Sequence, residues 1–581
     1  MPWVAARSSI EPLIPNPSSA RLLYSMNTMT DAKIEAEKPA APADPATQAG
    51  AGPQNSVPSS WATLAHELFR LLWIASVVSN IGTMMQEVGA SWLMTELAPS
   101  PLMVALIQTA GALPVLLLSF AAGALADIVD RRWLLIFSQC WMLVAAAGLG
   151  ILTVSHLTSP LMLLAFTFLL GFGNALTGPV WQAIVPELVP RAEMGAAISI
   201  NSVGYNVARA AGPALGGLVV AALGSGAVFL LNAVSFLGVI VVFYRWRRKP
   251  RKSVLPAERV MSAMRAGWRY VAHAPSIRFT LVRLSLFMLG ASAFWGLVPL
   301  FARQDLGRGA AGYGVLLGFF GSGAVLGGSI LPHLQRKFGV KALLNYTTFL
   351  NVCALVLMAV WRIYPVACVA AFASGFAWTT ALSTFNTSVQ LNTAAWVRGR
   401  AMAFYQLTYF VMLGAGSALW GTIAEHVGIP QTLLAAALSL VLGLAVEARY
   451  PVGLGEGLNF EPSARPVPIV FNEPHSEHGP VLVTVEYYID PRRAAEFNLA
   501  MLELGRFRRR DGAVDWGLFE DVVEPGRYLE TFVVESWGEH LRQHERTTMA
   551  DRQVSERANS FHCRDIPPVV SHLLYAYYQE T

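Results

Sequence analysis

Two charged side chains lie deep inside long apolar runs of the sequence, and they are the first candidates for chemistry. Glu87 lies within the run 69–95, and Arg209 lies within the run 193–221. A charge at the centre of a membrane costs about 2.5 kcal/mol or more, so an ionisable residue there is a functional candidate by default. Both lie at a similar distance from the start of their runs. We therefore hypothesise that Glu87 and Arg209 lie at a similar depth and form a pair.

The chemistry of such a pair is proton exchange. A carboxylate beside an arginine can take up and release a proton when its surroundings alternate between wet and dry. Polar residues extend the face of Glu87 at helical spacing, and of these Asn80 is a further candidate. Two other interpretations stay open: a permanent pair that only holds two helices together, or a Glu87 close enough to the outer headgroups to be solvated.

Four aromatic side chains are candidates to line a cavity for an aromatic or amphipathic molecule, because their rings offer large surfaces for stacking. The alternative for each is packing or anchoring at the membrane interface, which explains most aromatics in membrane helices. Arg283, near the start of another run, is expected to snorkel to the surface. The four cavity candidates are Trp181, Trp378, Tyr405 and Tyr409.

These residues must be positioned by membrane-spanning helices. Of 581 residues, 54% are hydrophobic and 14% are charged, far from the average of globular proteins. From 68 to 450 the chain alternates short turns with about twelve apolar runs of the ~20 residues that cross a bilayer. The formal charge of +5 does not indicate nucleic-acid binding, because the basic residues crowd into short turns on one side. This placement predicts that both termini are cytoplasmic.

A long polar and basic stretch, 247–276, divides the apolar runs into two sets of six. The two sets repeat at a constant offset of 204 positions, as in Gly123 with Gly327 and Tyr205 with Tyr409. A constant offset without gaps indicates a parallel duplication of a six-helix unit. Parallel repeats are a transporter architecture, in which the substrate is held between the halves near the midplane.

The predicted fold class is an all-α polytopic membrane protein of about twelve transmembrane helices in two six-helix halves, followed by an α+β ferredoxin-like soluble domain. The soluble elements are predicted as strands 481–489, 516–523 and 528–536 and helices 492–509 and 540–561. The predicted domains are a disordered leader 1–66, a first half 67–246, a cytoplasmic central loop 247–276, a second half 277–450, a linker 451–474 and the cytoplasmic domain 475–581.

A charged turn between the second and third runs contains Gly123, Asp127, Arg131 and Arg132. It resembles the loop between helices two and three of the major facilitator superfamily, whose pattern is Gly-x-Leu-Ala-Asp-Arg-x-Gly-Arg-Arg. The resemblance implies alternating access, with Asp127 acting as a cytoplasmic gate near the start of the eleventh helix. The second half has Leu331 at the equivalent place, so one acidic latch is expected. The alternative is that these residues only cap a turn and fix orientation.

A second motif lies in the fifth run, at Gly212, Pro213, Gly216 and Gly217. It is similar to the antiporter motif of the superfamily's exporters. The chain looks most like the branch that contains the bacterial enterobactin exporter and the transmembrane secretion effectors. This resemblance implies a secondary active transporter of the bacterial inner (plasma) membrane that exports small amphipathic molecules, siderophores or drugs. Coupling to proton entry is the hypothesis attached to Glu87.

The strand at 527–537 resembles those of the dimeric α/β barrels of antibiotic-biosynthesis monooxygenases, which implies homodimerisation through this domain. The domain shows no diagnostic catalytic motif, so we predict no catalytic residue and no cofactor. His540 and His544 stand one helical turn apart, a spacing that can hold a metal, but no third ligand is evident and no metal site is predicted. Two alternatives to an exporter remain: a membrane-anchored cytoplasmic monooxygenase-like enzyme, and an importer of the same superfamily.

Overall fold

The structure is a computed structural model, and the residues it describes are 60–576 without 129, 191–192, 247–259, 447–451, 454–458, 460, 462 and 464–473. Most of the predicted leader and of the predicted linker therefore lies outside the described residues. The last part of the predicted leader forms a short 3-10 helix, η1 (Ser60–Ala65), directly before the first long helix.

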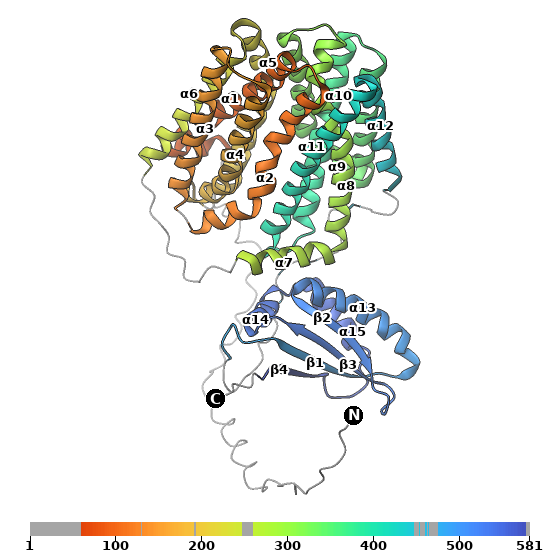
Figure 1. Cartoon of the computed structure of the whole chain (residues 1–581). Helices are drawn as coiled ribbons and strands as arrows, with labels where there is room; N and C mark the ends of the chain where they lie inside the picture. Colours follow the sequence, from red (N-terminus) through yellow and green to blue (C-terminus); the bar gives the residue numbers. More distant parts are fainter. Residues whose placement is uncertain are drawn as a thin grey trace, which may run out of the picture. The chain divides into compact units, whose positions relative to one another are not determined.

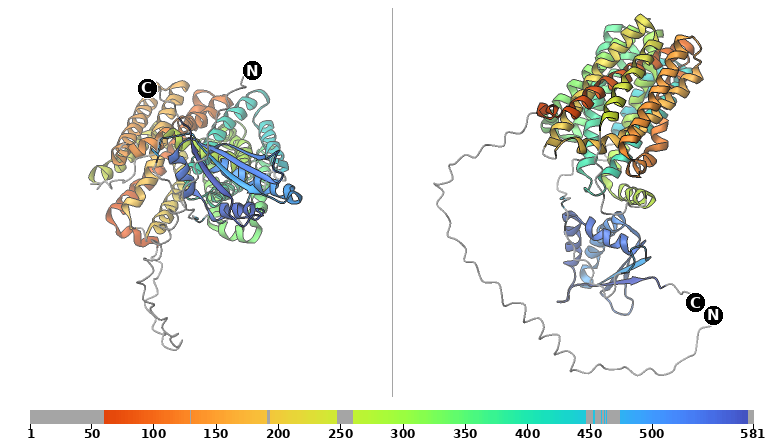
Figure 2. Two further views of the ribbon diagram at one scale, coloured as in Figure 1. Left: turned by 90° about the horizontal axis from the view of Figure 1, so that it is seen from below. Right: turned by 90° about the vertical axis from the view of Figure 1, so that its left-hand side faces the viewer.

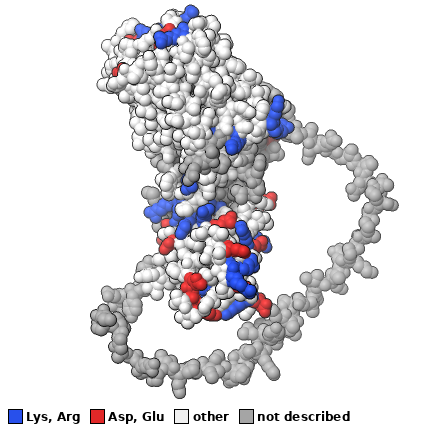
Figure 3. Space-filling model, turned by 90° about the vertical axis from the view of Figure 1, so that its right-hand side faces the viewer, with Lys and Arg blue, Asp and Glu red and all other residues white. Residues whose placement is uncertain are grey.

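Eleven of the described helices are long and apolar enough to cross a membrane. A helix satisfies its backbone polar groups within its own segment, which is why long apolar runs become helices in lipid. Figure 1 shows them as a bundle, and Figure 3 shows a broad band of that bundle without charged side chains on the face drawn. The helices are α1 (Glu67–Leu97), α2 (Pro101–Ile128), α3 (Arg131–Val154), α4 (Pro160–Leu188), α5 (Met194–Leu223), α6 (Ser225–Arg245), α8 (Pro275–Gln304), α9 (Ala310–Val360), α10 (Tyr364–Leu391), α11 (Arg398–Val427) and α12 (Ile429–Val446).

The number eleven differs from the predicted twelve because α9 contains two of the predicted runs. This helix has 51 residues, and Gly339 within it has the non-helical angles φ 70° and ψ 166°. A positive φ costs glycine little, so the chain breaks the helix at this residue. The predicted runs 311–333 and 341–361 lie on either side of the break. When α9 is counted as two helices, one on each side of Gly339, the number of spans is the predicted twelve.

The backbone of the two halves repeats at the offset seen in the sequence. Gly224, between α5 and α6, has φ 83° and ψ 166°, and Gly428, between α11 and α12, has φ 89° and ψ 161°. These two glycines are 204 positions apart. The contacts between the halves repeat as well, because α2 packs against α11 and α5 packs against α9. At the offset of 204 positions, α2 corresponds to the first part of α9, and α5 corresponds to α11. The α2–α11 contact and the α5–α9 contact are therefore equivalent.

The bundle has two ends, which we name by the residues that lie there. At the 97–101 end, α1 ends and α2 begins, and at the 245–275 end, α6 ends and α8 begins. The contacts that join the halves lie between the 97–101 end and the middle of the bundle. Ser100 Oγ donates to Glu425 over 2.9 Å, and Thr109 Oγ1 donates to the carbonyl oxygen of Gly414 over 2.8 Å.

The predicted central loop 247–276 contains a helix that the sequence interpretation missed, α7 (Val260–His273). It is amphipathic, and its 14 residues are fewer than the ~20 that cross a bilayer, so it does not form an apolar run. Tyr270 and Val271 on its apolar face are buried in the core of the second half. α7 also contacts the C-terminal domain through α13 (Ala494–Asp511), and Arg269 Nη1 of α7 lies 3.3 Å from Glu535 Oε1.

The C-terminal domain is one antiparallel sheet with helices on one face, as the side view in Figure 2 shows. Its strands are β1 (Val481–Tyr488), β2 (Ala513–Glu520), β3 (Arg527–Val534) and β4 (Val569–Leu574), in the spatial order β2-β3-β1-β4. Alternate residues of β1 are buried, as expected for a strand with one covered face. β4 was not predicted.

The predicted single helix 540–561 is also corrected, because the structure has two helices, α14 (Trp537–Arg546) and α15 (Met549–Asn559). Thr547 is the C-cap of the first helix, and Thr548 is the N-cap of the second. Its side chain accepts a hydrogen bond from the Asp551 backbone N–H, and the Asp551 side chain accepts one from the Thr548 N–H, which forms a capping box. A local hydrogen-bond pattern of this kind starts a new helix inside a segment whose periodicity looks continuous.

Candidate functional site

Glu87 lies on α1 and Arg209 lies on α5, and these two helices pack against each other. Glu87 is exposed, while its neighbours Gln86 and Val88 are buried, so its face of α1 does not belong to the packed core. In the described part of the chain no ion pair within 4.0 Å joins the two charges, and the predicted direct pair is not formed. Arg209 still acts electrostatically on the Glu87 carboxylate.

Aromatic hydroxyls of the second half face this charged pair. Tyr313 of α9 and Tyr409 of α11 both lie within electrostatic range of Glu87, and Tyr409 also of Arg209. The Arg209 guanidinium lies over the ring of Tyr205, 5.6 Å from its centroid. The arrangement therefore places one acid, one base and three phenols between α1, α5, α9 and α11, where the two halves face each other.

Asn80 is half-buried on α1, seven positions before Glu87 and so on the same side of the helix. A separate polar contact, which sequence reasoning missed, lies on the packed side of α1. There Asn232 of α6 donates to Gln86, and Ser235 Oγ donates to Asn232 Oδ1 over 3.1 Å. The signal for it was an amide side chain in each of two apolar runs. Because both amides are buried, this network holds α1 against α6. Asn80 and Glu87 lie on another side of α1, outside this network.

Trp378 and Tyr409 belong to one aromatic cluster in the second half. Their ring centroids are 6.2 Å apart, and Trp295 of α8 lies 5.8 Å from Trp378. Tyr405 is buried one turn before Tyr409, and its hydroxyl donates to the carbonyl oxygen of Leu382 over 3.1 Å. Three of the four predicted cavity residues are thus neighbours.

The fourth predicted cavity residue, Trp181, lies elsewhere. Its ring makes an edge contact with Phe243 of α6 at 6.1 Å, within the apolar core between α3, α4 and α6. The structure therefore gives Trp181 a packing role inside the first half and does not bring it to the aromatic cluster.

Buried polar atoms without partners lie within the aromatic cluster. The indole N–H groups of Trp295 and Trp378 are buried and have no hydrogen-bond partner among the residues that the structure describes. Native structures leave few buried polar atoms unpaired, and such atoms call for an explanation. Donors of this kind can bind the polar atoms of a molecule whose apolar part stacks on the rings.

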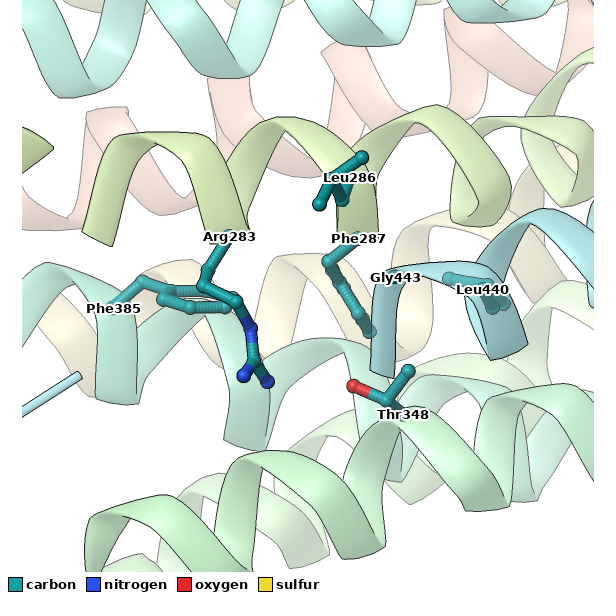
Figure 4. Close-up of a pocket in the computed structure, with 7 residues that line it drawn as sticks. All are labelled: Arg283, Leu286, Phe287, Thr348, Phe385, Leu440 and Gly443. Atoms are coloured by element: carbon teal, nitrogen blue, oxygen red, sulfur yellow. The ribbon is translucent and has the colours of Figure 1, made fainter. Parts of the chain in front are cut away.

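Arg283 does not snorkel to the surface as predicted. It is 5% exposed on α8, and its Nη2 donates to Asn345 Oδ1 over 3.3 Å. Figure 4 shows its side chain extending past Phe385 toward Thr348 in a small pocket. Because the Asn345 amide oxygen on α9 accepts a hydrogen bond from Arg283 inside the fold, the guanidinium does not need to reach the headgroup region. The pocket lies within the second half and is lined by Arg283, Leu286, Phe287, Thr348, Phe385, Leu440 and Gly443.

The charged turn is only partly described. Gly123 and Asp127 lie in the last turns of α2, and the side chain of Asp127 falls outside the described residues. Arg132 lies in the first turn of α3, and its guanidinium donates to the carbonyl oxygens of Phe243 and Tyr244 over 2.8 and 2.6 Å. Those carbonyls are at the end of α6, where a helix leaves acceptors unpaired. Arg132 therefore caps α6, while the gate role of Asp127 and Arg131 stays a prediction.

The glycine motif of α5 has a packing function. A methyl group added to Gly212 would lie 2.5 Å from Met84 Cβ of α1, and one added to Gly217 would lie 2.5 Å from Gly314 Cα of α9. Gly216 approaches the Met85 backbone in the same way, and Pro213 is buried with all three. The motif therefore lets α5 touch α1 within its own half and α9 across the boundary between the halves.

The C-terminal domain contains a histidine cluster that the sequence did not reveal. His540 and His544 of α14 are joined by His572 of β4, and ligand nitrogens of the three lie within 4.8 Å of one another. No third ligand was evident in the sequence, and the unpredicted strand β4 brings His572 beside the pair as a candidate. Burial, with the imidazoles of His544 and His572 and the charge of Arg508, lowers the pKa of His540 to about 3. Burial also lowers the pKa of His572.

Known proteins similar to this chain are membrane transporters. The chain matches the protein family described as transmembrane secretion effector over residues 58–580. The staphyloferrin A transporter of Staphylococcus aureus (strain NCTC 8325 / PS 47) is 23% identical over 369 residues, which cover 63% of this chain and 92% of that protein. The multidrug efflux pump Tap of Mycolicibacterium fortuitum is 24% identical over 387 residues, which cover 64% of this chain and 93% of that protein.

Solved structures show the same fold. The crystal structure of a bacterial homologue of the iron transporter ferroportin in an inward-facing state superposes with a TM-score of 0.53 at 14% identity. The match covers 66% of this chain and 98% of that chain.

Proposed function

This chain belongs to the transmembrane secretion effector family of the major facilitator superfamily, and on that premise we propose that it exports small amphipathic molecules of the siderophore or drug class. Membership makes it a multi-pass membrane transporter and not an enzyme. The direction of transport, the class of substrate and the coupling to protons are our proposal. The names of two relatives, a siderophore transporter and a multidrug efflux pump, support the substrate class.

The observation that carries the proposal is the group of polar side chains between the halves. Glu87 and Arg209 of the first half face Tyr313 and Tyr409 of the second. A carboxylate that exchanges protons at this place can bind a proton in one state of the transporter and release it in another. The aromatic cluster around Trp378 begins at Tyr409, so a substrate stacked on it would sense the charge of Glu87.

Alternating access is the mechanism that fits this arrangement. The described contacts between the halves lie between the 97–101 end and the middle of the bundle, so this structure corresponds to a state closed at that end. We propose that the 245–275 end is cytoplasmic, with both termini in the cytoplasm of a bacterial cell and the bundle in its inner membrane. In the opposite state, Asp127 and Arg131 would close the cytoplasmic end against α11.

We also propose that the C-terminal domain is a ferredoxin-like module that forms homodimers. The order β1-α13-β2-β3-α14-α15-β4 is a β-α-β-β-α-β succession with the second helix divided, and the strand order β2-β3-β1-β4 is compatible with it. Apolar side chains of β4 such as Val569 and Leu573 are more than half exposed, which suits an interface between two copies.

The test of this function is transport into inverted membrane vesicles. Ethidium and staphyloferrin A are suitable probes, because one is a cationic drug and the other is the substrate named for a relative. An exporter coupled to proton entry accumulates at least one of them when the vesicle interior is acidic. Accumulation stops when a protonophore collapses the gradient.

The importer alternative gives the opposite result. An importer in inverted vesicles would release a preloaded probe when the gradient is applied and would not accumulate it. Vesicles from cells without the protein set the background. Accumulation equal to that background for every probe of a wider siderophore and drug panel would reject the proposed export.

A further inference from the structure

The histidine cluster of the C-terminal domain takes no part in the proposed transport, and its geometry is that of a metal site. His540, His544 and His572 each place one ring nitrogen within 4.8 Å of the others. The ring centroids of His540 and His544 are 4.9 Å apart, and those of His540 and His572 are 4.8 Å apart. His540 is therefore the central ring, with one partner on its own helix and one on the sheet.

Helix α14 positions the first two histidines. Ser536 caps its start by accepting a hydrogen bond from the Glu539 backbone N–H over 3.3 Å. Residues four apart share one side of a helix, so His540 and His544 point the same way. Trp537, one turn before His540, packs on it with ring centroids 5.5 Å apart. The helix start and the indole together fix the direction of the two imidazoles.

Strand β4 positions the third histidine. β4 pairs antiparallel with β1, and His572 stands opposite Val483. Residues directly opposite in a ladder place their side chains on the same face of the sheet. Val483 is 2% exposed and belongs to the covered face, so His572 points to the side where the helices lie. A shift of β4 by one residue would turn His572 to the other face, and the register is therefore essential to the cluster.

The distances suit a small cation. Nε2 of His540 and Nε2 of His544 are 3.3 Å apart. In a tetrahedral zinc site with Zn–N of ~2.0–2.1 Å, two ligand nitrogens are roughly 3.3–3.4 Å apart. Two histidines at positions i and i+4 of a helix form the usual zinc-binding pair of helical metal sites. His572 is half-buried, and its ligand nitrogen lies within 4.8 Å of those of His540 and His544.

The second ring nitrogen of His540 is consistent with such a site. Nδ1 of His540, a residue that is only 2% exposed, is buried and makes no direct hydrogen bond within the described part of the chain. A buried ring nitrogen without a partner is costly and rare. When Nε2 of His540 binds an ion, Nδ1 keeps the ring proton and can donate it to a neighbouring side chain such as Gln543, which interacts with His540.

We propose that His540, His544 and His572 form a three-histidine site for a divalent transition-metal ion, with Zn²⁺ as its ion. Imidazole ligands suit Zn²⁺, Cu²⁺ and Ni²⁺, and a cluster without carboxylates disfavours Mg²⁺ and Ca²⁺, which require oxygen ligands. Three protein ligands leave a fourth position for water or another ligand. Because His572 belongs to the edge strand β4 and the other two to α14, the ion would tie that strand to the helix layer.

The test is metal binding by the full-length chain, purified in detergent with a tag that contains no histidine. Co²⁺ serves as the spectroscopic probe, because a tetrahedral site gives it visible absorption bands, and Zn²⁺ then displaces it. We expect about one ion per chain, as a single three-histidine site requires. Hydrogen exchange of the β4 amides, measured on the wild type with and without Zn²⁺, should slow when the ion binds.

Two variants and one control assign the ligands. His544→Asn and His572→Asn should each weaken Zn²⁺ binding more than about 100-fold, because even outer-shell changes at zinc sites cost 10–100-fold. His475→Asn removes an exposed histidine of the same domain and should bind Zn²⁺ like the wild type. Any of three results would overturn the proposal. The wild type binds less than about a tenth of an equivalent, all four proteins bind Zn²⁺ equally, or the hydrogen exchange of the β4 amides does not change when Zn²⁺ is added.

Discussion

The two halves of the bundle share one backbone plan but carry different chemistry. Glu87 and Arg209, the charged pair of the candidate site, both belong to the first half. The positions 204 residues later are Ala291 and Leu413, which are 1% and 8% exposed. A charge inside a membrane span is costly, so a second copy is not retained where it has no use. We interpret the first half as the part that handles the proton.

The aromatic cluster shows the reverse distribution. Trp378 and Tyr405 of the second half correspond to Asn174 and Asn201 in the first. Packing contacts at helix ends, glycines and the pair Tyr205 and Tyr409 are repeated. The charges of Glu87 and Arg209 and the rings of Trp378 and Tyr405 are not. Duplication therefore preserved the contacts that hold the helices and allowed the interior to diverge into a charged half and an aromatic half.

The largest effect is expected from the charged half. Glu87→Gln keeps the size of the side chain and removes its titratable proton, so transport driven by a pH gradient should fall more than about tenfold. Uptake of ethidium by inverted vesicles measures it. Glu96→Gln makes the same change near the end of α1 and should transport like the wild type. Full pH-driven transport by Glu87→Gln would contradict the assignment of proton chemistry to the first half.

The repeated packing is the next target. A methyl group at Gly217 would already lie 2.5 Å from Gly314 Cα, so Gly217→Leu should destabilise the bundle by about 1–3 kcal/mol and lower transport. A methyl group at Gly421 would lie 2.6 Å from Ala105 Cβ in the α2–α11 contact, so Gly421→Leu should have a similar effect. Thermal unfolding in detergent is the measurement, and Gly195→Leu on α5, with no atom within 4 Å, is the control. Unequal effects of the first two variants would break the equivalence of the two contacts.

The aromatic half should respond with a smaller change in apparent affinity. Trp378→Phe keeps a ring and removes the unpaired indole N–H, and we expect the KM for the transported probe to rise about threefold to tenfold with little change in maximal rate. Transport rates over a range of substrate concentrations separate a change in KM from a change in maximal rate. Trp181→Phe, in the packed core of the first half, should leave KM unchanged. Equal shifts for both variants would show that the cluster has no special contact with substrate.

The smallest effect concerns the turns that were duplicated. Arg132→Gln loses two hydrogen bonds to the end of α6 and should lower the stability of the bundle by about 1–2 kcal/mol. Its second-half equivalent, Arg336, donates within its own helix to the carbonyl oxygen of Pro332 over 3.3 Å, and no other hydrogen bond of its side chain is formed with the described residues. Arg336→Gln should therefore change stability by less than about 0.5 kcal/mol. Similar shifts in the melting temperature of the two variants would show that the turns remained equivalent.

Much of the fold was predictable from the sequence because the signals are local and long. A run of ~20 apolar residues specifies a membrane helix whatever its neighbours are. The repeated glycines at a constant offset predicted two halves with matching contacts, and Gly224 and Gly428 have the same backbone angles. The family followed from the turn at Gly123 and from the glycine motif at Gly212.

The errors arose where short elements or packing decide the outcome. α7 is amphipathic and shorter than a membrane span, so its burial against the second half was invisible in the sequence. Trp181 and Trp378 are the same residue type in similar apolar runs, and only helix packing separates a core residue from a member of the aromatic cluster. Arg283 was assigned to the surface by its position near the end of a run, although Asn345 provides an internal acceptor.

The sequence by itself determined the membrane helices, the duplication and the candidate charges, because each depends on residues that are near in the chain or on a fixed offset along it. Only the tertiary structure decided which side chains meet. The orientation of Glu87 away from a direct pair with Arg209 depends on how α1 and α5 are rotated against each other. Whether His572 lies close to His540 and His544 depends on the register of β4 against β1. Both are set by long-range packing, which sequence periodicity does not encode.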